Sequence, residues 1–387
     1  MFKVAIGQSI DPLEKNAVRE VLAKINAILG KTMPQAGILF CPEAYKHKLV
    51  LSSIREAYPG LELIGCTTDG TISSDGGYEA DALVLMTFAT DLGEIKAGKG
   101  TASEDTDFEV GLSAASMARD KLENTKGEMR FAIMLMDALN AGVSEVNMGI
   151  EKILGTGFPL IGGAAAAHSK KRQTYQFYND EILTHSLVLL LFTGKIGFSC
   201  GIQGGHWPMA EKVRVTSSRK NILYTIEDKP ALNYFQKYIG KDSSLFINYC
   251  LAVYEEDRAG YYVRSAPFCN PEEGSITLNG VIAEKASIQL GTADKTSCLQ
   301  SCNASIKNAL THSRDRIVAA VFFSCAGRKI MQGSKVVQED NTVKKFFGSL
   351  PYIGFYGYGE FGPLNPGESS MFHGTTFVSL LITSPEE

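Results

Sequence analysis

The sequence lacks the charge imbalance that marks several common classes of protein. Its 387 residues include 38 Lys and Arg against 42 Asp and Glu, and no block of like charge occurs. The resulting net charge of −4 gives no electrostatic footprint for nucleic acid or for an anionic membrane. These counts argue against a nucleic-acid-binding protein.

Membrane and metal motifs are also missing. The longest apolar runs, such as 187–192, are far shorter than the roughly 20 residues that span a bilayer. Residues 1–7 are strand-like and lack the order of a signal peptide, so we expect a cytoplasmic protein with mostly reduced cysteines. No Cys-x-x-Cys pair predicts a zinc ribbon or a c-type haem attachment. Cys298 and Cys302, four residues apart, are explained by a packed helix.

Three segments of the chain follow one plan, at residues 37–88, 131–192 and 317–382. Each reads as a buried strand, a helix, an Ile-Gly turn or short strand, a polar loop and another buried strand. Apolar runs of four to eight residues bounded by turn residues are typical of strands covered on both faces. The sequence therefore predicts a mixed α/β fold built from repeated strand–helix–strand units.

A more β-rich stretch separates the second and third segments. It alternates as a strand over 212–216, continues over 221–226, and then opens a helix at Pro230 that Gly240 ends. Low-complexity sequence and long flexible linkers are absent. We place the boundary after Gly240 and predict two domains, residues 1–240 and 241–387.

Motifs spread along the chain resemble those of one known family. Residues 205–209, 215–216, 226–232 and 238–240 resemble the end of the FIST N domain, and residues 64–70 and 161–165 resemble its glycine-rich turns. The FIST C domain is resembled by 263–265, 323–328, 354–360 and 373–376. Each motif is weak alone, but their order and spacing make the resemblance specific. His206 stands where many members carry Trp, and Ala166-Ala167-His168 replaces a more acidic turn.

The resemblance implies a bacterial intracellular sensory module that binds a small ligand and performs no catalysis. A chain made of the two FIST domains alone is similar to the stand-alone nitric-oxide-sensing proteins of this family. Those proteins bind haem and act on a partner histidine kinase or cyclic-di-GMP enzyme. The resemblance therefore implies b-type haem, regulation of such a partner in trans, and a homodimer as a further expectation. The alternative ligand is a small amino-acid-like metabolite without haem.

Two histidines are candidate haem ligands, because the axial side chain of a haem sensor is usually a neutral imidazole. His206 lies in a glycine-flanked turn beside Trp207, whose ring can stack on a porphyrin. His168 follows four alanines, and these small residues leave room for a flat ligand. We predict His206 as the first choice of axial ligand and His168 as the second.

Cys325, Arg328 and Glu360 form a second group, because the repeat plan places them at the same end of the sheet. The arginine could hold a carboxylate or a haem propionate in a bidentate pair, or it could form an internal ion pair with Glu360. A rival interpretation makes Cys325 the nucleophile of a thiol hydrolase with His373 as its base. Glycines that allow close backbone approach complete the predicted ligand-binding set: Gly65, Gly162, Gly163, Cys325, Arg328 and Glu360.

Overall fold

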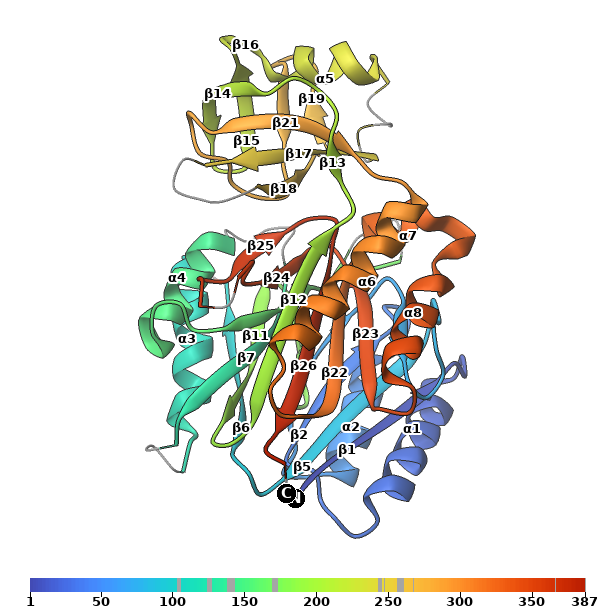
Figure 1. Cartoon of the computed structure of the whole chain (residues 1–387). Coiled ribbons are helices and arrows are strands. Elements are labelled where there is room, and N and C mark those ends of the chain that lie inside the picture. Colours follow the sequence, from blue (N-terminus) through green and yellow to red (C-terminus); the bar gives the residue numbers. More distant parts are fainter. Residues whose placement is uncertain are drawn as a thin grey trace.

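The computed structural model describes residues 1–102, 106–123, 127–137, 143–168, 173–242, 246, 248–255, 261–266, 268–365 and 367–386 (Figure 1). Three units of one plan follow each other along the chain, and a smaller domain is inserted into the third.

Unit 1 contains β1 (Phe2–Ser9), α1 (Glu14–Leu29), β2 (Ala36–Cys41), α2 (His47–Ala57), β3 (Glu62–Thr67), β4 (Thr71–Ser73) and β5 (Leu83–Thr90). Unit 2 contains β6 (Ile95–Thr101), α3 (Asp107–Asp120), β7 (Met129–Met136), α4 (Val143–Leu154), β8 (Leu160–Ala164), β9 (Gln176–Tyr178), β10 (Glu181–Leu183) and β11 (Ser186–Thr193). Unit 3 contains β12 (Gly197–Gly204), α6 (Lys295–His312), β22 (Arg316–Cys325), α7 (Ala326–Gln332), the 3-10 helix η2 (Gly333–Lys335), α8 (Val337–Phe347), β23 (Tyr352–Gly357), β24 (Glu360–Gly362), β25 (Met371–His373) and β26 (Thr376–Ser384).

The order of the main strands is the same in all three units. It is β1-β5-β2-β3 in the first, β6-β11-β7-β8 in the second and β12-β26-β22-β23 in the third. The last two strands of this order (β2 and β3, β7 and β8, β22 and β23) are parallel and are joined by a helical crossover. The strand that closes each unit (β5, β11 or β26) is antiparallel to the first strand of that parallel pair. This confirms the predicted mixed α/β fold of repeated strand–helix–strand units.

A short strand of each unit pairs with a strand of another unit. Strand β4 of unit 1 pairs with β23 of unit 3, β9 of unit 2 pairs with β3 of unit 1, and β24 of unit 3 pairs with β8 of unit 2. Three equivalent backbone hydrogen bonds accompany the exchange: Ala166 N to Thr67 O at 2.9 Å, Tyr358 N to Ala164 O at 3.1 Å and Asp69 N to Tyr356 O at 2.9 Å. The units therefore close into a ring with approximate threefold symmetry. We call the end formed by loops 67–71, 164–168 and 356–360 the mouth.

A single apolar core fills the ring. Phe40, Leu135 and Phe323, which occupy equivalent positions on β2, β7 and β22, belong to this core. A separate cluster lies between each sheet and its own helices. The strands are thus buried on both faces, which is why their sequences are almost continuously apolar. No helix among the described residues is both long enough and apolar enough to cross a membrane.

The glycine after each isoleucine of the repeat lies inside a parallel pair of strands. An added Cβ would lie 2.5 Å from Leu39 O at Gly65, 2.7 Å from Phe322 O at Gly354, and closer still to Met134 O at Gly162. The three contacts are equivalent, because each glycine is the register partner of the residue that supplies the oxygen. The sequence predicts that Gly65 and Gly162 bind ligand. In the structure they lie where the absence of a side chain lets two paired strands approach each other closely.

Replacing Gly162 by alanine is expected to destabilise the protein by about 1–3 kcal/mol, because a strand backbone cannot move away as a side chain can. The Gly60→Ala variant is the matched control, since an added Cβ there meets no atom within 4 Å. Urea unfolding of both variants measures the difference. Equal midpoints for the two variants would contradict the packing role.

The inserted domain occupies residues 205–292 and stands above the mouth in Figure 1. Its elements are β13 (Trp207–Pro208), β14 (Val213–Arg219), β15 (Ile222–Ile226), β16 (Lys229–Pro230), α5 (Ala231–Ile239), β17 (Tyr249–Tyr254), β18 (Tyr262–Ser265), β19 (Phe268–Asn270), β20 (Ser275–Thr277) and β21 (Ser287–Thr292). They enclose a hydrophobic core of their own. The chain enters and leaves through a two-stranded neck, residues 205–208 and 291–294, in which Trp207 pairs with Thr292 and Pro208 with Gly291.

The boundary predicted after Gly240 falls inside this inserted domain. Helix α5 ends at Ile239, yet Phe235 on that helix shares one core with Leu251 on β17. The spatial division instead follows the neck, with all three units on one side and residues 205–292 on the other.

Candidate functional site

The mouth brings together one polar side chain from each unit. Asp69 Oδ1 accepts a hydrogen bond from Lys329 Nζ at 2.8 Å and lies 2.8 Å from His168 Nδ1. The side chain of His168 is 62% exposed, whereas those of Asp69 and Lys329 are 13% and 15% exposed. Sequence reasoning missed Asp69 and Lys329, although the repeat plan places the loop after β3 and the helix after β22 at one edge. This cluster ties the three units together at the surface of the mouth.

Glu360, the first residue of β24, is fully buried. Its Oε2 accepts hydrogen bonds from Thr376 N at 2.9 Å and Thr376 Oγ1 at 2.7 Å, while Oε1 has no hydrogen-bond partner. Burial raises the pKa of this carboxyl to about 8, against the lowering effects of Thr376, Arg328 and Cys325. The carboxyl is therefore mainly protonated at neutral pH and can donate a hydrogen bond.

Gly163 explains how Glu360 comes to lie in an apolar environment. The two residues are directly opposite each other in the β8–β24 pair, so they face the same side of the sheet. An added Cβ at Gly163 would lie 3.0 Å from Phe355 Cζ and 3.2 Å from Phe323 Cδ1. Gly163 and Glu360, both predicted to bind ligand, therefore lie side by side at the end of the apolar core nearest the mouth.

His206 lies at the foot of the neck and is 6% exposed. The Thr375 hydroxyl donates to Gly374 O at 2.6 Å, so it accepts from His206 Nδ1 at 3.1 Å. Nδ1 therefore carries the proton, and the lone pair is on Nε2, which is buried without a partner. Burial, together with the positive charge of Arg328, lowers the pKa of His206 to about 4. The ring is neutral at physiological pH.

Cys325, the last residue of β22, is buried beside Glu360. Burial and the neighbouring Glu360 raise the pKa of its thiol far above the ordinary value. Because the thiolate is the nucleophilic form of cysteine, this environment does not favour the thiol-hydrolase interpretation. His373, the candidate base, places its Nε2 2.9 Å from Gly362 O. The thiol is also a weak hydrogen-bond donor, so it does little to satisfy Glu360 Oε1.

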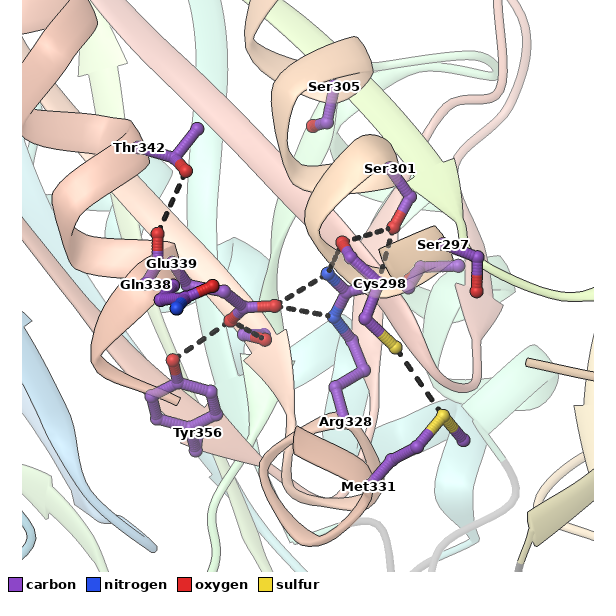
Figure 2. Close-up of polar contacts among 12 residues, drawn as sticks. Ser297, Cys298, Ser301, Ser305, Arg328, Met331, Gln338, Glu339, Thr342 and Tyr356 are labelled. Carbon is purple, nitrogen blue, oxygen red and sulfur yellow. Dashed lines mark hydrogen bonds and ion pairs between the residues drawn. The ribbon is translucent and has the colours of Figure 1, made fainter. Parts of the chain in front are cut away.

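Arg328 lies on α7 and is fully buried in a network of polar groups, shown in Figure 2. Its Nη2 and Nε donate to Glu339 Oε1 at 2.6 and 3.2 Å. The remaining donors reach Ser301 Oγ and Cys298 O on α6, each at 2.7 Å. Burial alone would lower the pKa of Arg328, but Glu339 raises it above the ordinary value.

The other oxygen of Glu339 is occupied as well. Its Oε2 accepts hydrogen bonds from Tyr356 Oη at 2.8 Å and from Ser324 Oγ at 3.0 Å. Of the two alternatives for Arg328, the ion pair with Glu360 is not formed, because the arginine is paired with Glu339 on α8. The four hydrogen bonds that Arg328 donates all stay within unit 3, so the arginine is an internal support of that unit.

Residues 372–376 connect the inserted domain to the buried groups. Arg264 Nη1 on β18 donates to Phe372 O at 2.8 Å. Asn279 Nδ2 approaches Gly374 so closely that a Cβ there would overlap it. The next two residues bond the buried histidine and the buried carboxyl described above. One short segment thus contacts the inserted domain, the neck and the interior of the ring.

A b-type haem would need a flat apolar slot as well as an axial imidazole. His206 has the required neutral ring with a bare Nε2, but the ring is packed against protein. His168 lies at the surface with its Nδ1 on Asp69. Within the part of the chain that the structure describes, two cavities lie around His185 and around Arg55, and neither is lined by His206 or His168. The residues near the two predicted axial ligands do not form a haem site in this conformation.

Comparison with known families agrees with the motifs. Residues 35–229 match the FIST N domain, and residues 231–363 match the FIST C domain. The chain belongs to the FIST family. FIST domains are sensory domains, and the presence of both in this chain suggests a role in sensing small ligands. The junction between the two FIST domains, at residue 230, lies within the inserted domain of the structure.

Relatives of this FIST protein span nearly all of its length. An uncharacterised protein of Mycobacterium tuberculosis (strain ATCC 25618 / H37Rv) is 20% identical over 399 residues, which cover 98% of this chain and 100% of the relative. An uncharacterised protein of Methanocaldococcus jannaschii is 23% identical over 359 residues, which cover 86% of this chain and 68% of the relative. Among solved structures, a cyanuric acid hydrolase from A. caulinodans covers 100% of both chains with a TM-score of 0.42 and 8% identity. This similarity is too low to carry an inference about activity.

Proposed function

We propose that this FIST protein is a small-ligand sensor that performs no catalysis and signals to a separate partner. The observation that supports it is the contact of residues 372–376 with the inserted domain, with His206 and with Glu360. A ligand bound at this junction would change how the inserted domain sits on the mouth. The neck is the hinge of that movement, and the partner reads the altered surface.

The partner class follows from the resemblance to stand-alone FIST sensors, which act on a histidine kinase or a cyclic-di-GMP enzyme. The assay is autophosphorylation of a purified histidine kinase, measured with the ligand-free and the ligand-saturated protein. We expect the two forms to change the rate by different amounts. If neither the ligand-free nor the ligand-saturated protein changes the activity of such a kinase or cyclic-di-GMP enzyme, the proposed partner class is contradicted.

We take the ligand to be a small amino-acid-like metabolite rather than haem. The buried groups at the junction are neutral and offer hydrogen bonds, whereas a porphyrin would need the packed residues around His206 to separate. The expected spectrum of purified protein after incubation with haem therefore has no saturable Soret band. A stoichiometric Soret band that His206→Ala abolishes, without loss of melting temperature, would overturn this choice and restore nitric oxide as the signal.

The rival function is an enzyme that uses Cys325. We expect no hydrolytic turnover that depends on this thiol, because its raised pKa keeps it protonated. The comparison is between the wild type and Cys325→Ala on a panel of amide and thioester substrates. Turnover by the wild type that the variant lacks would replace the sensor proposal with an enzyme.

A further inference from the structure

A cavity opens in unit 2, beside the ends of β6 and β7 and the start of β11, where α3 and α4 begin. Its volume is about 280 Å³, counting the part that is open to solvent. Drug-sized ligands occupy pockets of about 300–1,000 Å³, so this cavity admits the head group of a small molecule and no large ring system. The residues that line it are Ala102, Asp107, Val110, Met136, Asp137, Val146, His185, Ser186 and Leu187.

The buried charge of this cavity comes from Asp137, which directly follows β7. Its side chain is 5% exposed, and its Oδ2 lies 3.1 Å from Nδ1 of His185, whose side chain is 53% exposed. A carboxylate oxygen only accepts hydrogen bonds, so in the neutral imidazole Nδ1 carries the proton and Nε2 has the lone pair. Asp107, the first residue of α3, adds a second carboxylate to the lining. The polar lining is therefore rich in hydrogen-bond acceptors.

The charges around the cavity favour a cation. Among the described residues that line it there is no lysine or arginine. The positive ends of the α3 and α4 dipoles lie nearby, but acidic residues in the first turns of both helices offset them: Asp107, Glu109 and Glu145. A carboxylate or phosphate group would face two carboxylates here. A primary ammonium group carries three N–H donors and no acceptor, which complements this lining in both charge and hydrogen bonding.

We infer that this cavity binds the primary ammonium group of a small metabolite, with Asp137 as the main partner of the charge and Asp107 and His185 beside it. The remainder of the molecule lies in the opening to solvent. This inference rests on the proposed sensor function, and it names the group by which the protein recognises its amino-acid-like ligand.

The wall of the cavity is connected to the segment that contacts the inserted domain. Val146 on α4 lines the cavity and belongs to the same apolar cluster as Phe372. The carbonyl oxygen of Phe372 accepts a hydrogen bond from Arg264 of the inserted domain at 2.8 Å. Asn147, the next residue on α4, donates to Ser370 O at 3.1 Å. A ligand that shifts the first turn of α4 therefore acts on residues 372–376 from the side of unit 2.

The test is a ligand-observed NMR titration of the full-length protein with two matched pairs of compounds. L-Alanine is compared with L-lactate, and 2-aminoethanol with ethylene glycol, so that a hydroxyl replaces the ammonium group in each pair. We expect each amine to bind at least about tenfold more tightly than its partner, because a hydroxyl brings neither the charge nor three donors. The second pair lacks a carboxylate and shows whether a simple amine is sufficient.

Two variants test the site by different means. Asp137→Asn keeps the shape of the side chain but removes its charge, so it should weaken binding of the amines by about tenfold or more. Ala102→Leu leaves the carboxylates in place and fills the cavity, so it should also abolish binding. Asp120→Asn, an exposed carboxylate at the other end of α3, is the matched control and should bind as the wild type does. Melting temperatures of all variants are measured in parallel, so that loss of binding is not confused with unfolding.

The outcomes distinguish the site from the function. Absence of amine binding, equal binding of an amine and its hydroxyl partner, or binding that neither Asp137→Asn nor Ala102→Leu weakens would overturn the site. Regulation of the partner by another class of ligand would leave the sensor proposal standing in spite of that result. Amine binding that these variants abolish, without any effect on the partner, would support the site and contradict the sensor function.

Discussion

Replacing Arg328 by methionine is expected to lower the free energy of unfolding by about 3–5 kcal/mol, the usual cost of removing one partner of a buried ion pair. The large effect arises because Glu339, which is fully buried, would keep its charge without the guanidinium that neutralises it. Ser301 Oγ and Cys298 O would also lose their donors. Urea unfolding of the wild type and the variant measures the difference.

A second substitution separates the unpaired charge from the loss of packing. Glu339→Gln removes the charge but retains an oxygen for Tyr356 and Ser324. The double variant Arg328→Met/Glu339→Gln should therefore recover about 2 kcal/mol or more relative to Arg328→Met alone. If the double variant is no more stable than the single one, the ion pair is not the source of the effect, and a ligand-holding role for Arg328 deserves another test.

The stability of the wild type is expected to fall between pH 6.5 and pH 8, and Glu360→Gln should abolish that fall. The pKa of Glu360 is raised from 4.5 to about 8. Between these values the folded protein holds a proton that the unfolded chain has released, so stability decreases by about 1.4 kcal/mol per pH unit as the pH rises. Above the folded pKa the loss is complete.

His206 has the opposite effect over a lower range of pH. Its pKa is lowered from 6.5 to about 4, so below pH 6.5 the unfolded chain binds a proton that the folded protein does not. Stability then increases as the pH rises towards 6.5, and this offsets the Glu360 contribution between pH 4.5 and pH 6.5. From pH 6.5 to pH 8 Glu360 acts without this offset, and the expected loss is about 2 kcal/mol.

The measurement compares urea midpoints of the wild type and Glu360→Gln at pH 6.5 and pH 8. Contributions from other titrating groups are common to both proteins, so the difference between the two pH profiles isolates Glu360 and the groups that contact it. The same slope in both proteins would show that Glu360 is ionised in the folded state.

Much of the fold could be predicted because each repeat has short sequence patterns that indicate its strands. Apolar runs and the Ile-Gly steps mark the strands, and the glycines recur because each parallel pair brings a carbonyl against the same position. The exchange of β4, β9 and β24 could not be predicted, since each strand has only three residues and pairs with another unit. The inserted domain could not be recognised as one unit for a similar reason, because its core joins residues on both sides of Gly240.

The repeat explains why some of the predicted residues lie close together, whereas their ligand-binding role stays a prediction. His206, Cys325, Gly163 and Glu360 do lie around the junction, because the ends of equivalent strands meet at one edge of the ring. The partner of Arg328 could not be read from the sequence, since Glu339 is one of many acidic residues and becomes its neighbour because α7 and α8 both pack against α6. The same holds for Asn279, whose contact with Gly374 depends on how the inserted domain sits on the mouth.

Hydrogen–deuterium exchange of the full-length protein, with and without a saturating amino-acid ligand that regulates the partner, tests the account most directly. The account predicts slower exchange of the backbone amides of residues 372–376 and of the neck at 205–208 and 291–294, with little change on the far side of the ring around α1. Protection confined to the ring far from the mouth, or no protection of 372–376 by any ligand that regulates the partner, would contradict a sensor that reads its ligand at this junction.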